Sequence, residues 1–281
     1  MIEQATWYLG PLGDLRPLVV PNPGVKIDEV RYGGIHQGLS GARTMDITGH
    51  RREYTLTVGY LDQDEFRWYE ALHTRLVPGP FRLIDPFRKN RLSVQASRLL
   101  PVESRNNGVY LSSAHTLSRD WPSDVTITSR SLGLSGWSGN NAFLQFDQQR
   151  PAPLVGDEVL TASVYLRADA AYPVILRMAW YDQDRVWISN TDVTVQVDTE
   201  WTRYWHAFGE APDDAAAATF TLVLGAAATQ VYVAAPQVEA DAPYPTSWEI
   251  GGGAPVVLLD QLPSTSLRFP LRDVELSLLE A

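Results

Sequence analysis

Short runs of alternating apolar and polar residues, separated by turn-forming residues, recur through the second half of this 281-residue sequence. Alternation with a period of two places successive side chains on opposite faces of a strand. The clearest runs are residues 160–166, 201–208 and 220–224. The run 174–182 is apolar almost throughout, which is typical of a strand packed on both faces. Short strands at this spacing predict an all-β sandwich or jelly roll.

The first hundred residues add a strand and one helix. Residues 53–61 alternate as a half-buried strand does, and Asp62 with Glu65 three residues later is a capping box that begins a helix. An apolar stripe follows at helical spacing: Phe66, Tyr69, Leu72 and Leu76. Residues 78–80, Pro-Gly-Pro, end the helix because proline cannot continue it. We therefore expect an all-β protein with one α-helix at residues 62–77.

The end of the chain predicts a discontinuous domain. Residues 249–255 are glycine-rich and resemble a linker, and the segment 267–279 after it contains one short strand. A lone terminal strand must pair with an existing sheet, because it cannot satisfy its own backbone groups. We expect one domain built from residues 1–96 and 254–281, with residues 101–250 inserted as a second domain.

Charge and composition exclude several classes of function. The chain carries 33 acidic and 23 basic residues, a net charge of −10, which argues against nucleic acid or an anionic membrane as partner. No apolar run approaches the ~20 residues of a membrane span, and the first residues lack the pattern of a signal peptide. With no cysteine, disulfides, thiolate zinc sites and cysteine nucleophiles are ruled out.

A search for catalytic motifs is mostly empty. The five histidines are not at metal-ligand spacing, and no G-x-S-x-G, phosphate loop or G-x-G-x-x-G is present. Paired carboxylates for sugar hydrolysis have no sequence signature, and nothing singles out a pair. We expect no enzymatic activity and no cofactor.

Aromatic residues are the better candidates for binding. Six of them gather at two places: Trp180, Tyr181 and Trp187 around a turn, and Trp201, Tyr204 and Trp205 on one strand. Such rings stack on the C–H faces of sugars, and this predicts a carbohydrate-binding surface. The alternative is that they pack in the core and at the edges of the sandwich.

A small basic cluster stands out in the acidic chain: Arg43, His50, Arg51 and Arg52. One interpretation is a solvated strand end. The other is a contact between subunits, in which arginine pairs with carboxylates of a neighbour.

The two ends of the sequence resemble the distal tail proteins and related minor tail proteins of long-tailed bacteriophages. The likeness is carried by Trp7 with Leu9-Gly10, residues 38–44, 53–61, 62–77, 79–86, 90–93 and 271–276. The resemblance implies a split β-barrel with one helix, which assembles as a ring, commonly a hexamer. It also implies that the ring joins the tail tube to the hub and host-recognition proteins.

The middle of the sequence resembles the galactose-binding-like jelly rolls of carbohydrate-binding modules and phage tail fibres. The likeness is carried by residues 201–204, 231–240 and 245–248. It implies a sandwich that binds host cell-surface glycans. Members of this group often hold a structural calcium ion, for which this sequence offers no matched ligand set.

Together the two resemblances predict a structural protein of the phage tail tip, assembled in the host cytoplasm and located in the virion. Two alternatives stay open. One is a carbohydrate-active enzyme or depolymerase component that uses the jelly roll for targeting. The other is a stand-alone lectin-like binding module.

Overall fold

The computed structural model confirms an all-β architecture. It describes residues 6–18, 24–38, 40–46, 49–100, 108–112, 116–118, 127–128, 130–137, 142–225 and 230–281. The chain divides into two units. The first is Met1–Pro11, Arg16–Leu83 and Pro255–Ala281, and the second is Leu12–Leu15 and Ile84–Ala254. Besides the expected helix, α1 (Gln63–His73), the described residues include a one-turn helix, α2 (Val94–Ser97).

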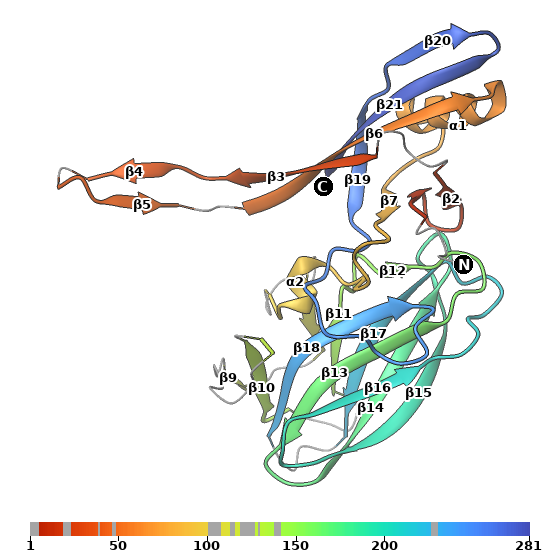
Figure 1. The fold of residues 1–281 in the computed structure, drawn as a ribbon. Helices are drawn as coiled ribbons and strands as arrows, with labels where there is room; N and C mark the ends of the chain where they lie inside the picture. The colour runs from red at the N-terminus through yellow and green to blue at the C-terminus, as the bar shows by residue number, and fades with distance from the viewer. Residues whose placement is uncertain are drawn as a thin grey trace. The chain divides into compact units, whose positions relative to one another are not determined.

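The first unit is built on one eight-stranded sheet (Figure 1). In sheet order its strands are β2 (Arg16–Pro17), β1 (Tyr8–Gly10), β7 (Phe81–Ile84), β19 (Val256–Gln261), β21 (Leu271–Glu280), β6 (Gly49–Leu61) and β3 (Val25–Tyr32), and β20 (Ser264–Arg268) pairs with β21. The sheet order runs from β2 at one end to β3 at the other. The split barrel that the resemblance implies corresponds to this sheet.

The C-terminal strand returns to the first part of the chain. β21 pairs with β6 from Val274 opposite Val58 to Leu279 opposite Glu53, and β19 joins the same sheet beside it. Alternate residues of β6 and β21 are fully buried because the side chains on one face of each strand meet the core. The expected pairing of the terminal strand with a strand from residues 1–96 is therefore confirmed.

Helix α1 begins as predicted and ends earlier. The Asp62 carboxylate accepts hydrogen bonds of 2.9 Å from the backbone amides of Asp64 and Glu65, and the Glu65 carboxylate accepts one of 3.0 Å from the Asp62 amide. The helix ends at His73, so Leu76 lies beyond it and is 80% exposed. The prediction of a helix to residue 77 was wrong at this end.

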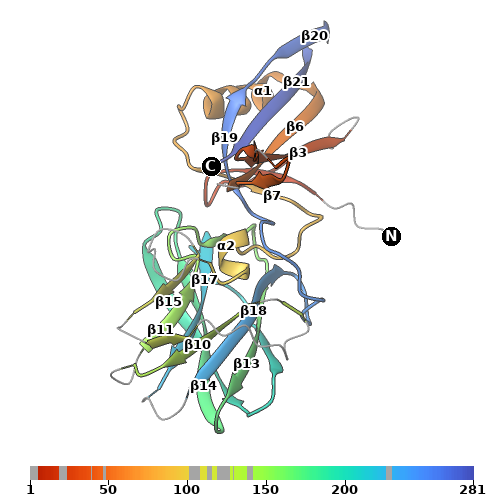
Figure 2. The ribbon, with the colours of Figure 1, turned by 90° about the vertical axis from the view of Figure 1, so that its left-hand side faces the viewer.

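The second unit is a sandwich of two antiparallel sheets, seen as two layers in Figure 2. The five-stranded sheet has the order β16 (Thr202–Ala207), β13 (Leu160–Ala168), β18 (Val231–Ala240), β10 (Ser131–Ser135) and β9 (Thr116–Ser118). The six-stranded sheet has the order β15 (Trp187–Val197), β14 (Tyr172–Tyr181), β17 (Ala217–Leu224), β11 (Ala142–Phe146) and β8 (Val109–Leu111), and β12 (Ala152–Pro153) pairs with β17. The remaining strands, β4 (Ile35–Gln37) and β5 (Arg43–Met45), pair with each other in the first unit.

An apolar core fills the space between the two sheets. Val164 and Leu166 of β13 and Leu176 and Met178 of β14 are all fully buried. Their neighbours along each strand point to the opposite face, which leaves each sheet one outer face. The two outer faces are where polar and aromatic side chains can meet a ligand.

The segment 84–96 belongs to the second unit and not, as expected, to the first. Leu92 and Ala96 are buried in the core of the sandwich. The Asn90 side chain, fully buried, accepts hydrogen bonds of 3.2 Å from the amides of Leu92 and Val238. Burial of these apolar and amide groups explains why the segment leaves the first domain before the expected boundary.

The glycine-rich stretch that resembles a linker is tightly packed in the second unit. A Cβ atom on Gly251 would lie 2.2 Å from the carbonyl oxygen of Leu92, and one on Gly253 would lie 2.3 Å from that of Arg88. Only glycine allows backbones to approach so closely. These glycines therefore permit close packing and do not mark a flexible connection.

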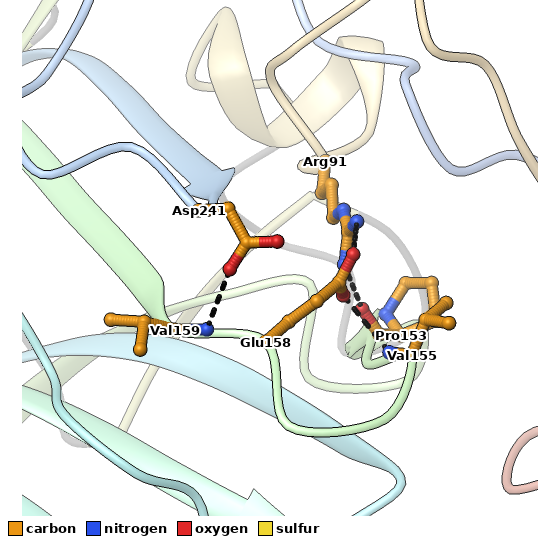
Figure 3. Close-up of polar contacts among 6 residues, drawn as sticks. All are labelled: Arg91, Pro153, Val155, Glu158, Val159 and Asp241. Atoms are coloured by element: carbon orange, nitrogen blue, oxygen red, sulfur yellow. Dashed lines mark hydrogen bonds and ion pairs between the residues drawn. The ribbon is translucent and has the colours of Figure 1, made fainter. Parts of the chain in front are cut away.

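A buried ion pair between Arg91 and Glu158 connects the segment 84–96 to the rest of the sandwich (Figure 3). The Arg91 guanidinium donates to both oxygens of the Glu158 carboxylate, at 2.5 and 2.7 Å, and to the carbonyl of Pro153 at 2.8 Å. The side chains of Arg91 and Glu158 are 7% and 15% exposed. Glu158 also accepts from the Val155 amide at 2.9 Å, so both partners are well satisfied.

We predict that Glu158→Gln lowers the free energy of unfolding by about 3–5 kcal/mol, because it leaves a buried guanidinium without its counter-charge. Asp192→Asn is the matched control, since the pair of Arg177 and Asp192 is more exposed and its loss costs about 1 kcal/mol or less. Urea unfolding of the full chain measures both. Equal effects of the two substitutions would contradict the prediction.

Candidate binding surfaces

A two-stranded hairpin arm extends from the sheet of the first unit (Figure 1). The pairing of β6 with β21 ends at Glu53, whereas β3 continues to pair with β6 as far as Tyr32 opposite Gly49. The ladder resumes where β4 pairs with β5. We call the described residues between 29 and 52 the hairpin arm. A two-stranded hairpin is marginally stable by itself in water, so this arm lacks the support that the rest of the sheet has.

Apolar side chains on the arm are open to solvent. Tyr32 is 50% exposed, Ile35 63% and Met45 49%. With two strands, the arm has no second layer among the described residues of its unit to bury them. Exposed apolar residues gathered on one element mark an interaction surface.

The predicted basic cluster is divided by the structure. Arg43 is exposed on β5 of the arm, and Arg51 is half-buried on β6. Arg52 is 5% exposed, and its Nε donates to the Glu280 carboxylate at 3.2 Å, which corrects its assignment to a subunit contact. The ion pair is intramolecular, and its side chains are 6% and 19% exposed. The side chain of His50 lies outside the described residues.

The predicted sugar-binding cluster is also divided, and two of its six rings face the core. Trp180 is fully buried, and its indole donates to the Thr191 hydroxyl at 2.9 Å. Tyr204 packs against the core, and its hydroxyl accepts from the Asp198 amide at 3.1 Å. Trp180 therefore offers no open face to a sugar, which corrects the prediction for it, and Tyr204 is partly buried and directed toward the core.

Two other rings lie on the outer face of the six-stranded sheet. Trp187 is 56% exposed, and its indole nitrogen donates to the Asn190 side chain at 2.9 Å. A bulge in β15 places Trp187 opposite Tyr181, whose hydroxyl accepts from Gln145 at 3.2 Å. We call these four residues the Trp187 face. It combines an open indole with amide groups, the chemistry that recognises sugar rings and hydroxyls.

The outer face of the five-stranded sheet carries arginines between aromatic rings. The Arg167 guanidinium carbon is 4.4 Å from the Tyr232 ring centroid and 5.6 Å from that of Trp201. Tyr165 lies two residues before Arg167 on β13 and is opposite Arg203 of β16. The guanidinium carbon of Arg203 is 5.7 Å from the ring centroid of Tyr165. We call these five residues the arginine–aromatic face. Cation–π contacts of this kind hold each guanidinium over a ring.

A further aromatic pair lies on the same outer face. Trp205, 37% exposed, meets Tyr244, 71% exposed, edge to face at a centroid distance of 5.5 Å. The segment that carries Tyr244 is fixed to the sheet through Thr246, which bonds to Glu239 through its amide at 3.1 Å and its hydroxyl at 2.5 Å. The predicted Trp201 and Trp205 are therefore brought together on one face.

Sequence reasoning missed Arg167, Tyr165, Tyr232 and Tyr244. The first two alternate with the core residues of β13, so their outward direction was readable from the period of two. Their meeting with Tyr232 and Trp201 depends on the order and register of three strands, which no local signal specifies.

The described residues contain neither a candidate metal site nor a candidate membrane-spanning helix. No three histidine or acidic side chains there gather closely enough to hold a metal ion. No helix in that part of the chain has the length and apolar character needed to span a membrane.

Comparison with known proteins finds likeness in structure alone. No family model and no curated protein matches the sequence. The enzymatically active domain of tailspike protein 4 of bacteriophage CBA120 matches 54% of this chain with a TM-score of 0.41 and 13% identity, and this chain covers 21% of it. The CBM22-1 xylan-binding domain of Paenibacillus barcinonensis Xyn10C matches 53% of this chain with a TM-score of 0.38 and 10% identity, and the match covers 91% of that domain. The module TmCBM61, in complex with β-1,4-galactotriose, matches 53% of this chain with a TM-score of 0.39 and 12% identity, and the match covers 97% of that module.

The division of the aromatic cluster predicts unequal effects on stability. Trp180→Ala removes a fully buried ring, and we expect a loss of about 3–5 kcal/mol in the free energy of unfolding. Trp187→Ala removes an exposed ring, and we expect a change of about 0.5 kcal/mol. Urea denaturation of each variant measures the difference. A Trp180→Ala protein as stable as the Trp187→Ala protein would refute the placement of the two rings.

Proposed function

We propose that this chain is a structural protein of a phage tail tip, which forms a ring with copies of itself and binds host glycans through its sandwich. The observation that supports the ring is the hairpin arm. Its ladder is two strands wide, and its apolar side chains are uncovered. Such an element is stabilised when it lies against another protein surface.

A second copy of the chain is the partner that suits the arm. The strand β3 is the end of its sheet, so its free edge offers backbone groups that an extended segment can pair with. The exposed Arg43 on the arm is attracted by a neighbour of net charge −10. An arm that contacts a different surface on the next copy makes a head-to-tail interface, and such interfaces generate a closed ring when the rotation closes.

The role proposed for the sandwich is attachment to the host surface. The Trp187 face and the arginine–aromatic face both present rings that stack on sugars. In this proposal the chain catalyses no reaction and needs no cofactor, and its partners are the tail tube, the hub proteins and cell-wall glycans. Binding of host cell-wall glycans should be weakened in Trp187→Ala and in Trp201→Ala, lost when the two substitutions are combined, and kept in Leu76→Ala, a control at an exposed residue of the other unit.

The ring is tested by the mass of the full chain in solution. We expect a particle near six times the 31.3 kDa of one chain by light scattering. Replacing Ile35 and Met45 with aspartate should reduce the mass to that of a monomer, because charge on the apolar arm opposes its burial. Leu76→Asp, also exposed but outside the arm, is the control and should keep the mass.

Three results would decide against the ring. A full chain that stays monomeric at every concentration would end the proposal, as would an arm variant that assembles unchanged. A monomer that releases sugars from host cell walls would favour a carbohydrate-active enzyme. A monomer that binds those glycans without cleaving them would favour a lectin-like module.

A further inference from the structure

We propose that the arginine–aromatic face binds an acidic glycan, in which a carboxylate or phosphate group lies next to a pyranose ring. The inference rests on the proposed glycan-binding role of the sandwich and names the class of glycan. It is carried by five side chains on the adjacent strands β16, β13 and β18 and at the residue before β16: Tyr165, Arg167, Trp201, Arg203 and Tyr232.

The face offers two kinds of chemistry within the length of one sugar. The rings of Trp201 and Tyr232 lie edge to face, 6.4 Å between centroids, and the Arg167 guanidinium is held over both. The rings suit the apolar C–H faces of a pyranose. The planar guanidinium suits the two oxygens of a carboxylate or phosphate, which it can bind bidentately.

Arg203 adds a second positive charge to the same face. It donates to the carbonyl oxygen of Thr246 at 2.5 Å and to the hydroxyl of Ser163 at 2.9 Å, and both acceptors are neutral. The buried Nε of Arg203 has no hydrogen-bond partner among the described residues. The nearby carboxylate of Glu239 is buried and accepts from Thr246. The two hydrogen bonds of the Arg203 guanidinium thus go to neutral oxygens, and an anionic ligand would be attracted to its charge.

The two outer faces differ in the way expected for different ligands. On the six-stranded sheet, Arg177 is paired with Asp192 through two hydrogen bonds of 2.7 Å, which raises the pKa of the guanidinium, and the groups beside Trp187 are amides. Amides suit a neutral glycan. On the five-stranded sheet, Arg167 and Arg203 lie against aromatic rings. Cationic groups set among rings in a chain of net charge −10 point to an acidic ligand.

Titration calorimetry with the full chain tests the inference. The probes are trigalacturonate and trimannuronate, each paired with its methyl ester, which keeps the sugar and linkage and removes the charge. A glycerol phosphate oligomer is the phosphate probe. We expect at least one acidic probe to bind ten-fold or more tightly than the neutral esters, because hydrogen bonds to charged groups are the stronger ones.

Arg167→Gln should weaken binding of the acidic probe at least ten-fold, and Trp201→Ala should abolish it. Arg177→Gln is the matched control on the other sheet and should leave binding unchanged. Preference for the uronates over the phosphate oligomer, or the reverse, identifies the acidic group and supports the inference either way. Circular dichroism confirms that each variant is folded.

The possible failures separate the inference from the function on which it rests. Equal binding of acids and esters, or an Arg167→Gln protein that binds as the parent does, would overturn the acidic class while the glycan-binding role stands. If neither these probes nor host cell-wall glycans bind, both proposals fail.

Discussion

The antiparallel pairing of β21 with β6 is the interaction on which the first unit depends. It brings the end of the chain back to residues 53–61 after the whole sandwich has intervened. Val58 meets Val274, Leu56 meets Leu276 and Tyr54 meets Leu278, and all six side chains are fully buried. At about 1.5–3 kcal/mol for each buried apolar side chain, this single contact contributes a large part of the stability of the unit. The sandwich can be inserted because this pair joins the two parts of the first unit that precede and follow it in the chain.

The same pairing also determines where the arm begins. Because the pairing of β21 with β6 ends at Glu53, the outer part of β6 has, among the described residues, one neighbouring strand, β3, and no second layer. The arm is thus the part of the β3–β6 ladder that extends beyond the end of β21. In our proposal, a second copy of the chain covers this element.

Local signals in the sequence predicted the elements better than their ends. The capping box of Asp62 and Glu65 was readable because it acts within one turn. Leu76 fitted the apolar stripe, but the helix stops at His73 and Arg75 takes a left-handed backbone conformation, with φ of 62°. Periodicity cannot detect such an ending.

Contacts between distant residues set the limits of prediction for the binding surfaces. Arg52 seemed available to a neighbour, and its partner is Glu280, 228 positions away. Trp180 and Tyr181 are adjacent in sequence, yet one is buried and the other lies on an outer face, because strand residues alternate. Choosing between them required knowing which face meets the core. The sequence contains the rings, but the sheets decide which of them can touch a ligand.

Cross-linking from the arm tests the central claim, that the arm contacts a second copy of the chain. The chain has no cysteine, so Ile35→Cys carries a single photoreactive label at a defined arm position. Illumination of the full-length protein should give a ladder of covalent multimers, with the link from residue 35 to a peptide of the neighbouring chain found by mass spectrometry. Monomer alone, or links confined to the same chain, would contradict the claim.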